Sequence, residues 1–215
     1  MKIRTTEQLV DAIDEDLAWR RKELTTLRFV IDRFRLKPRV LNTSLRAGIT
    51  LLYAHWEGFL KTSSELYVEF VGRQSLPNSQ LADNFLAISA RVPLHNMLSS
   101  PRITQSMSVV DFFRRKMTDN AVLPSSDSIK TRSNLSSEVL KDIASTVGVK
   151  FSLFETKATL IDEKLVNKRN HVAHGQFLDF DASGFEDLLD GVTAMMETWR
   201  NEIQNACITK RYRFT

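Results

Sequence analysis

The sequence predicts an all-α protein in which long amphipathic helices form a bundle. Apolar residues recur at intervals of three, four and seven through much of the chain, which places them along one face of a helix. Prolines and glycines are scarce, five and seven in 215 residues, and this scarcity favours long helices over a sheet with many tight turns. We expect one domain over residues 1–215, with about four long helices and a middle insert of shorter ones.

Two long helices are expected in the first third of the chain. The first apolar stripe covers residues 6–35, and Lys37-Pro38 interrupts it because proline disfavours helical geometry in the residue before it. The second stripe covers residues 41–73. Around Ile49–Leu60 apolar residues surround most of this helix, so we expect this part in the core. Two long helices joined by a short link normally form an antiparallel hairpin.

The middle of the chain, about 74–150, is less regular because four prolines divide it. The expected short helices cover residues 78–90, 104–118 and 135–147. Ser125–Ser128 is expected to form an exposed loop. The sequence leaves open whether residues 119–133 cover a cleft or bind a partner.

The last third returns to a helical pattern. One helix is expected over residues 153–174, ending at His174-Gly175, because glycine adopts the left-handed conformation that commonly ends a helix. A final helix is expected over residues 183–207.

Composition narrows the function classes. The net charge of +4 and pI near 9.3 are compatible with a polyanionic partner but do not demonstrate one. The single cysteine, Cys207, excludes an internal disulfide and a cysteine-based zinc cluster, and favours a reducing compartment. The amino terminus is not typical of a secretory signal, and the longest apolar stretch is too short to span a bilayer. We expect a cytoplasmic protein that does not enter a membrane.

The densest polar cluster, Asn167–Gly175, carries the chemistry that the sequence offers. It contains two of the four histidines, an arginine and no carboxylate. Histidine transfers protons near neutral pH, and the planar guanidinium of arginine matches phosphate oxygens. These groups suffice to cleave RNA through its own 2′-hydroxyl: one moves a proton while the other stabilises charge on the phosphorane.

Two segments resemble the HEPN superfamily. Arg169-Asn170-His171-Val172-Ala173-His174 is similar to its signature, which is an arginine, a polar residue, and a histidine after a gap of four to six residues. Upstream, Tyr53-Ala54-His55-Trp56-Glu57-Gly58-Phe59 resembles the second-helix motif of the RiboL-PSP-like HEPN branch. The similarity in arrangement covers most of the chain, although the middle insert adds little to it.

The resemblance implies a helical homodimer in which two motifs face one cleft. It also implies metal-independent RNA cleavage, with no cofactor, in toxin–antitoxin, antiphage-defence or RNA-processing systems, where an antitoxin or defence protein is the partner. By position, Arg169 would bind the scissile phosphate, His174 would transfer a proton, and Asn170 would orient one of them. The expected products are a 2′,3′-cyclic phosphate and a 5′-hydroxyl.

The spacing of Arg169 and His174 raises a geometric question. Residues five apart on a regular helix point about 140° apart, so these two would not share one face. Either the helix loosens near Gly175, or the working pair combines residues across a two-fold axis, as in an isologous dimer.

The roles of several other side chains have two interpretations. Glu57 either holds Arg169 in place or is an ordinary solvated carboxylate, and His171 is either a second acid or a surface residue. His55 is assigned to an interface or the surface. Candidate contacts for the RNA backbone are Lys168 and the tail residues Lys210, Arg211 and Arg213, although a chain end is more often frayed. His171 and His174 lack a third ligand nearby, so no metal site is expected.

Two basic runs, Arg20-Arg21-Lys22 and Arg114-Arg115-Lys116, are interpreted as solvated faces, and contact of either run with the RNA backbone is the alternative. Two further functions stay open beside the endoribonuclease. One is a catalytically silent HEPN-like module that binds RNA, a nucleotide or a protein. The other is a purely structural helical dimer within a larger complex.

Overall fold

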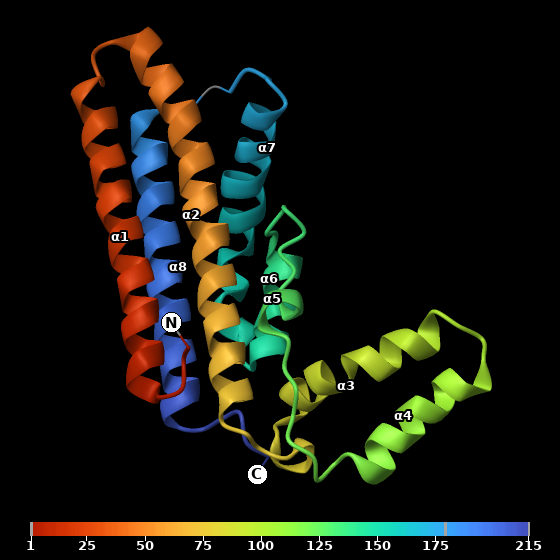
Figure 1. Cartoon of the computed structure of the whole chain (residues 1–215). Helices are drawn as coiled ribbons and strands as arrows, with labels where there is room; N and C mark the ends of the chain where they lie inside the picture. Colours follow the sequence, from red (N-terminus) through yellow and green to blue (C-terminus); the bar gives the residue numbers. More distant parts are fainter. Residues whose placement is uncertain (1, 179, 215) are drawn as a thin grey trace.

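The computed structural model describes residues 2–178 and 180–214, and these are almost entirely helical (Figure 1). The helical elements, including short 3₁₀ turns and one π-helix, are α1 Thr6–Arg33, α2 Pro38–Arg73, η1 Asn78–Gln80, α3 Asp83–Leu98, α4 Ile103–Arg115, α5 Ser125–Ser128, α6 Ser137–Val147, η2 Phe151–Leu153, η3 Glu155–Lys157, η4 Leu160–Asn167, α7 Lys168–Ala173 and α8 Ala182–Ile208. Extended pairing in the described residues is limited to two isolated bridges, Pro77 with Asn120 and Leu81 with Arg213. The all-α prediction is confirmed.

The bundle consists of α1, α2, α8 and the continuous η4–α7 segment, which run side by side in Figure 1. Its centre contains fully buried aromatic side chains, among them Trp56 of α2 and Trp199 of α8. The ring of Phe154 packs 5.8 Å from that of Trp199, centroid to centroid. Burial of each such side chain contributes about 1.5–3 kcal/mol, so this shared core holds the helices side by side.

The ends of α1 and α2 follow local sequence rules. A capping box begins α1, because the Thr5 hydroxyl accepts from the Gln8 backbone and the Gln8 side chain accepts from the Thr5 backbone. The second helix begins at Pro38 and not at the expected residue 41. Proline lacks only an N–H that has no partner in the first turn of a helix, so it can stand there.

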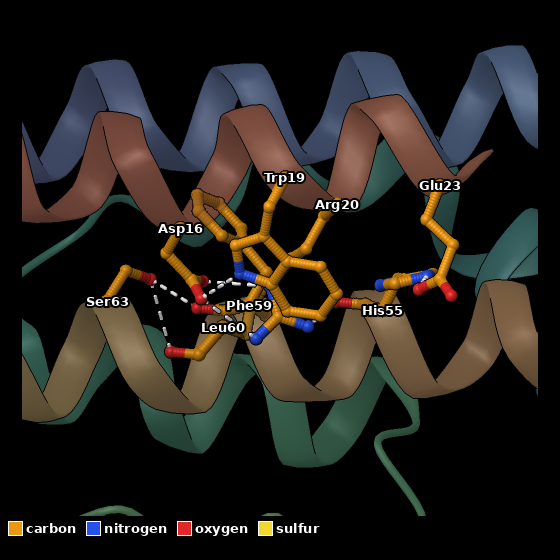
Figure 2. A network of polar contacts seen from close by, with 8 residues as sticks. All are labelled: Asp16, Trp19, Arg20, Glu23, His55, Phe59, Leu60 and Ser63. Carbon is orange, nitrogen blue, oxygen red and sulfur yellow. Dashed lines mark hydrogen bonds and ion pairs between the residues drawn. The ribbon is translucent and has the colours of Figure 1, made fainter. Parts of the chain in front are cut away.

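A network of polar contacts joins α1 to α2 (Figure 2). The Arg20 guanidinium donates to both carboxylate oxygens of Asp16, at 2.8 and 3.2 Å, and lies over the Trp19 ring. Arg20 also donates to the His55 carbonyl at 3.4 Å. Because only 7% of Arg20 is exposed, its interpretation as part of a solvated face is wrong.

His55 is also buried, with 2% of its surface exposed, between α1 and α2 (Figure 2). Its Nε2 lies 2.8 Å from a carboxylate oxygen of Glu23, and its ring meets the Trp19 ring edge-on. Burial lowers the pKa of His55, although the charge of Glu23 opposes the shift. Within the chain, His55 is therefore a packed residue between two helices, and its assignment to the surface is wrong.

The middle insert differs from expectation in two places. Helix α3 continues through Pro93 to Leu98 and packs against α4, and this pair extends away from the bundle (Figure 1). Residues 125–128 form one helical turn, α5, in place of an exposed loop. Ser128 is 4% exposed, and its hydroxyl donates to the Pro124 carbonyl at 2.6 Å, which explains why this polar segment can pack against α2.

Candidate functional site

The arginine–histidine motif lies on α7, which continues directly from the π-helix η4. Three apolar residues of η4, Ile161, Leu165 and Val166, are buried in the bundle. A π-helix is wider than an α-helix and frequently marks a functional site. The irregularity thus falls before the motif, over residues 160–167, while residues 168–173 form a regular α-helix.

The motif helix ends at His174 in a Schellman arrangement. The backbone N–H of Gln176 donates to the His171 carbonyl at 2.9 Å, and the N–H of Gly175 donates to the Val172 carbonyl at 3.0 Å. Gly175 has a φ of +71°, in the left-handed region that favours glycine. The helix thus ends at His174-Gly175, as the sequence predicted, and His174 is exposed there.

Arg169 points toward α2 and is held there by two contacts. Its guanidinium carbon lies 3.8 Å from the centroid of the Tyr53 ring, within the range of a cation–π contact. One guanidinium nitrogen, Nη2, donates to the carbonyl of Ser133 at 2.8 Å. The aromatic face and the carbonyl together fix the plane of the guanidinium.

Ser133–Ser137 is the return segment, where the insert rejoins the bundle. The Leu135 N–H donates to the Tyr53 hydroxyl at 2.7 Å. The backbone N–H and hydroxyl of Ser137 donate to the Asp162 carboxylate at 2.7 and 2.5 Å. The end of the 119–133 stretch therefore lies against the motif arginine.

The other motif residues occupy distinct places. His171 is partly buried, and its Nδ1 lies 2.8 Å from the Asn167 carbonyl oxygen. Because a carbonyl only accepts, Nδ1 carries the proton and Nε2 keeps its lone pair in neutral His171. Asn170 is also partly buried, and its carbonyl accepts from the His174 backbone.

Glu57 lies one helical turn after Tyr53 on α2 and is partly buried. Its negative charge raises the pKa of Tyr53, but burial of the phenol is the larger cause. No ion pair joins Glu57 to Arg169 in the structure, and Arg169 is held by the Tyr53 ring and the Ser133 carbonyl instead.

Arg169 and His174 are not brought together within one chain. The α-helix is regular between them, and Arg169 is held against α2. The His174 ring has no hydrogen bond or ion pair with any described residue. Loosening near Gly175, one of the two options that the spacing left open, is not observed.

The candidate RNA contacts lie at two ends of the bundle. Lys168 is beside the motif, where its ammonium group lies 4.3 Å from the centroid of the Phe180 ring and borders a pocket of about 390 Å³. The tail with Lys210, Arg211 and Arg213 lies at the opposite end (Figure 1). It is not frayed, because Arg211 pairs with Glu202 and the Tyr212 carbonyl accepts from the Ala82 backbone.

No group of three histidine, cysteine, aspartate or glutamate side chains in residues 2–178 and 180–214 is placed to hold a metal ion. No helix in the same ranges is long and apolar enough to cross a bilayer.

Sequence reasoning missed the role of Tyr53 and of the return segment. Tyr53 lies within the upstream motif, and this position was a signal for its role. An aromatic residue near a motif arginine is a potential cation–π partner. Ser133 carried no signal, because its backbone carbonyl makes the contact.

An all-helical bundle whose arginine–histidine motif lies at the end of a helix, with the histidine exposed, defines a HEPN-type domain. The model of the family described as MAE_28990-like HEPN matches residues 9–212, and the chain belongs to that family. The HEPN assignment from the two motifs is thereby confirmed, and membership indicates a nuclease-like or related HEPN module. No curated protein and no solved structure matches the chain.

Proposed function

We propose that the protein is a metal-independent endoribonuclease that acts as a homodimer. The observation that carries the proposal is the placement of Arg169 on the Tyr53 ring, five residues before an exposed His174. A guanidinium of fixed orientation suits a phosphate, and an exposed imidazole can reach a substrate.

The reaction uses the 2′-hydroxyl of the RNA as nucleophile. His174 takes the proton as the 2′-oxygen attacks phosphorus, and Arg169 stabilises the negative charge that develops on the phosphorane. The bond to the 5′-oxygen then breaks, and a proton is transferred to that oxygen. The products are a 2′,3′-cyclic phosphate and a 5′-hydroxyl, with no water consumed. Asn170 positions the pair by hydrogen bonding.

The geometry of the single chain supports the proposed dimer. A regular helix separates the directions of Arg169 and His174, and the His174 ring has no partner among the described residues to orient it. A two-fold axis would place His174 of one copy opposite the motif of the other and supply both proton donor and acceptor. Such an enzyme suits a toxin or an antiphage-defence effector, held in check by a partner protein.

Cleavage of a mixed RNA in EDTA tests the proposal. Wild type is compared with Arg169→Ala and His174→Ala. The matched histidine control is His95→Ala, because His95 is exposed and belongs to α3, which extends away from the bundle. We expect cyclic phosphate ends from wild type and the control, and none from the motif variants. Equal activity in all four proteins would remove the motif from the reaction.

A second function is favoured by one specific observation. Arg169 already donates to Ser133 of its own chain, as it would in a module that binds RNA, a nucleotide or a protein without cleaving it. Toxicity on expression separates the two functions. Relief of toxicity by His174→Ala supports the enzyme, whereas toxicity that persists in this variant, or is absent in wild type, supports the silent module.

A further inference from the structure

Two segments at the end of the bundle that carries His174 contain no carboxylate. From Arg33 to Trp56 the chain has four arginines, one lysine and no aspartate or glutamate. From Leu165 to Leu178 it has a lysine, an arginine, two histidines and again no carboxylate. A surface made from both segments has an excess of positive charge.

The structure places these segments side by side. Arg46 of α2 donates to the Gln176 carbonyl at 2.5 Å, and the Asn42 side chain donates to the Leu178 carbonyl at 3.4 Å. The loop after His174 is thus attached to the first turns of α2. Figure 1 shows that the α1–α2 turn and the end of α7 lie at the same end of the bundle.

Three cations at this end are exposed and have no ion-pair partner in the described residues: Arg33, Lys37 and Arg39. Their neighbour Arg35 differs, because it pairs with Asp32 and with Glu186 of α8. The first turn of α2 contains no acidic residue. Their positive charges are therefore available to an external anion.

An aromatic side chain accompanies the cations. Phe177, three residues after His174, is 77% exposed. A phenylalanine in contact with water gains from stacking against a planar base, and cations beside an aromatic ring are the usual composition of a surface for single-stranded nucleic acid.

We propose that single-stranded RNA binds across the hairpin-tip surface, defined as Arg33, Lys37, Arg39 and Phe177. The proposal rests on the proposed function, because it takes RNA as the ligand of the adjacent motif. Phe177 stacks on a base next to the scissile phosphate, and the three cations neutralise phosphates farther along the strand. Arg39 is seven residues before Arg46, about 10 Å along α2, which corresponds to a few nucleotides from the motif end.

The test measures binding without cleavage. The probe is a fluorescein-labelled single-stranded RNA of about 20 nucleotides with a 2′-O-methyl group on every sugar, which cannot attack its own phosphate. Fluorescence anisotropy gives Kd at salt concentrations from about 0.1 to 1 M. The tip variant is Arg33→Ala/Lys37→Ala/Arg39→Ala. The control, Arg114→Ala/Arg115→Ala/Lys116→Ala, removes the same charge from α4.

The tip variant should lower the slope of log affinity against log salt by about 2, since each phosphate contact to a single strand contributes about 0.7. Over the tenfold salt range this corresponds to about 100-fold weaker binding at 0.1 M. The control should keep the wild-type slope. Phe177→Ala should weaken binding by roughly 5- to 100-fold with the slope unchanged.

Equal losses in the tip variant and the control, or a tip variant with wild-type affinity and slope, would overturn the proposal and leave this surface to an acidic protein. Circular dichroism verifies that every variant is folded. Cleavage of unmodified RNA is measured separately. If wild type binds RNA but does not cleave it, the proposed enzymatic function is wrong and the binding surface is retained. If wild type cleaves RNA and the tip variant binds with wild-type affinity and slope, the binding surface is wrong and the enzymatic function is retained.

Discussion

Replacement of Tyr53 tests how Arg169 is positioned, since Tyr53 makes two separable contacts. Its hydroxyl accepts from the buried Leu135 N–H at 2.7 Å, and its ring lies under the Arg169 guanidinium. Tyr53→Phe removes only the first contact and leaves a buried donor unsatisfied, at a cost of about 1–3 kcal/mol. For a chain of this length the melting temperature should fall by roughly 2–12 °C.

Tyr53→Leu removes the ring as well. The lost cation–π contact adds about 0.5–1 kcal/mol to the destabilisation, the lower part of the usual range because Arg169 is only partly buried. The larger consequence is for turnover, because a misplaced catalytic group can lower it by about 100-fold. We expect Tyr53→Phe to keep kcat and Tyr53→Leu to lose most of it.

The assay is RNA cleavage at a temperature where circular dichroism shows every variant folded. Tyr67→Phe is the matched control, because Tyr67 is a buried tyrosine of α2 whose hydroxyl has no hydrogen-bond partner in the described residues. It should change neither stability nor kcat by much. Equal kcat in Tyr53→Phe and Tyr53→Leu would refute the positioning role of the ring.

Three predictions concern the α1–α2 network. Asp16→Ala leaves Arg20 buried without its carboxylate, so unfolding should cost about 3 kcal/mol less and a thermal melt should shift down by roughly 6–12 °C. Gly58→Ala should destabilise by about 1–3 kcal/mol in urea titration, against the usual helix preference for alanine, because the new Cβ would lie 2.7 Å from Arg20 Nη1. Because burial lowers the pKa of His55, the unfolded chain binds its proton more readily; stability should be complete above the ordinary pKa of 6.5 and decline as pH falls below it. Thermal melts at pH 7.5 and 5.5 should show a smaller decline for His55→Gln, and an equal decline would contradict this assignment.

The long helices of the bundle were predictable because their apolar residues repeat with the helical period. Residues 183–207 were expected for the last helix, and α8 runs from Ala182 to Ile208. The burial of Arg20 was not predictable in this way. A charged residue beside an apolar stripe is predicted to be solvated unless its partner is known. Here the burial of Arg20 depends on its ion pair with Asp16 and on Gly58, which leaves space for the guanidinium to approach α2.

The candidate site was predictable in its residues but not in its contacts. The spacing of Arg169 and His174 identified both, and also showed that one regular helix would direct them apart. The Tyr53 and Ser133 contacts join residues 116 and 36 positions away from Arg169, and no local pattern encodes such pairings. Likewise, the local sequence predicts that a helix ends at Pro93, whereas packing of α3 on α4 keeps the helix intact.

The π-helix before the motif allows one continuous helix to meet two structural requirements. Residues Ile161, Leu165 and Val166 must face the core, and Arg169 must face the Tyr53 ring. Because the wider turn advances through a smaller angle per residue than an α-helix, it changes the rotational phase at which α7 continues from η4. Deletion of one residue from 160–167 would therefore turn Arg169 to a new azimuth, and it would also shift the buried side chains that follow the deleted position. The direction of the motif arginine is thus coupled to the packing of η4 in the bundle.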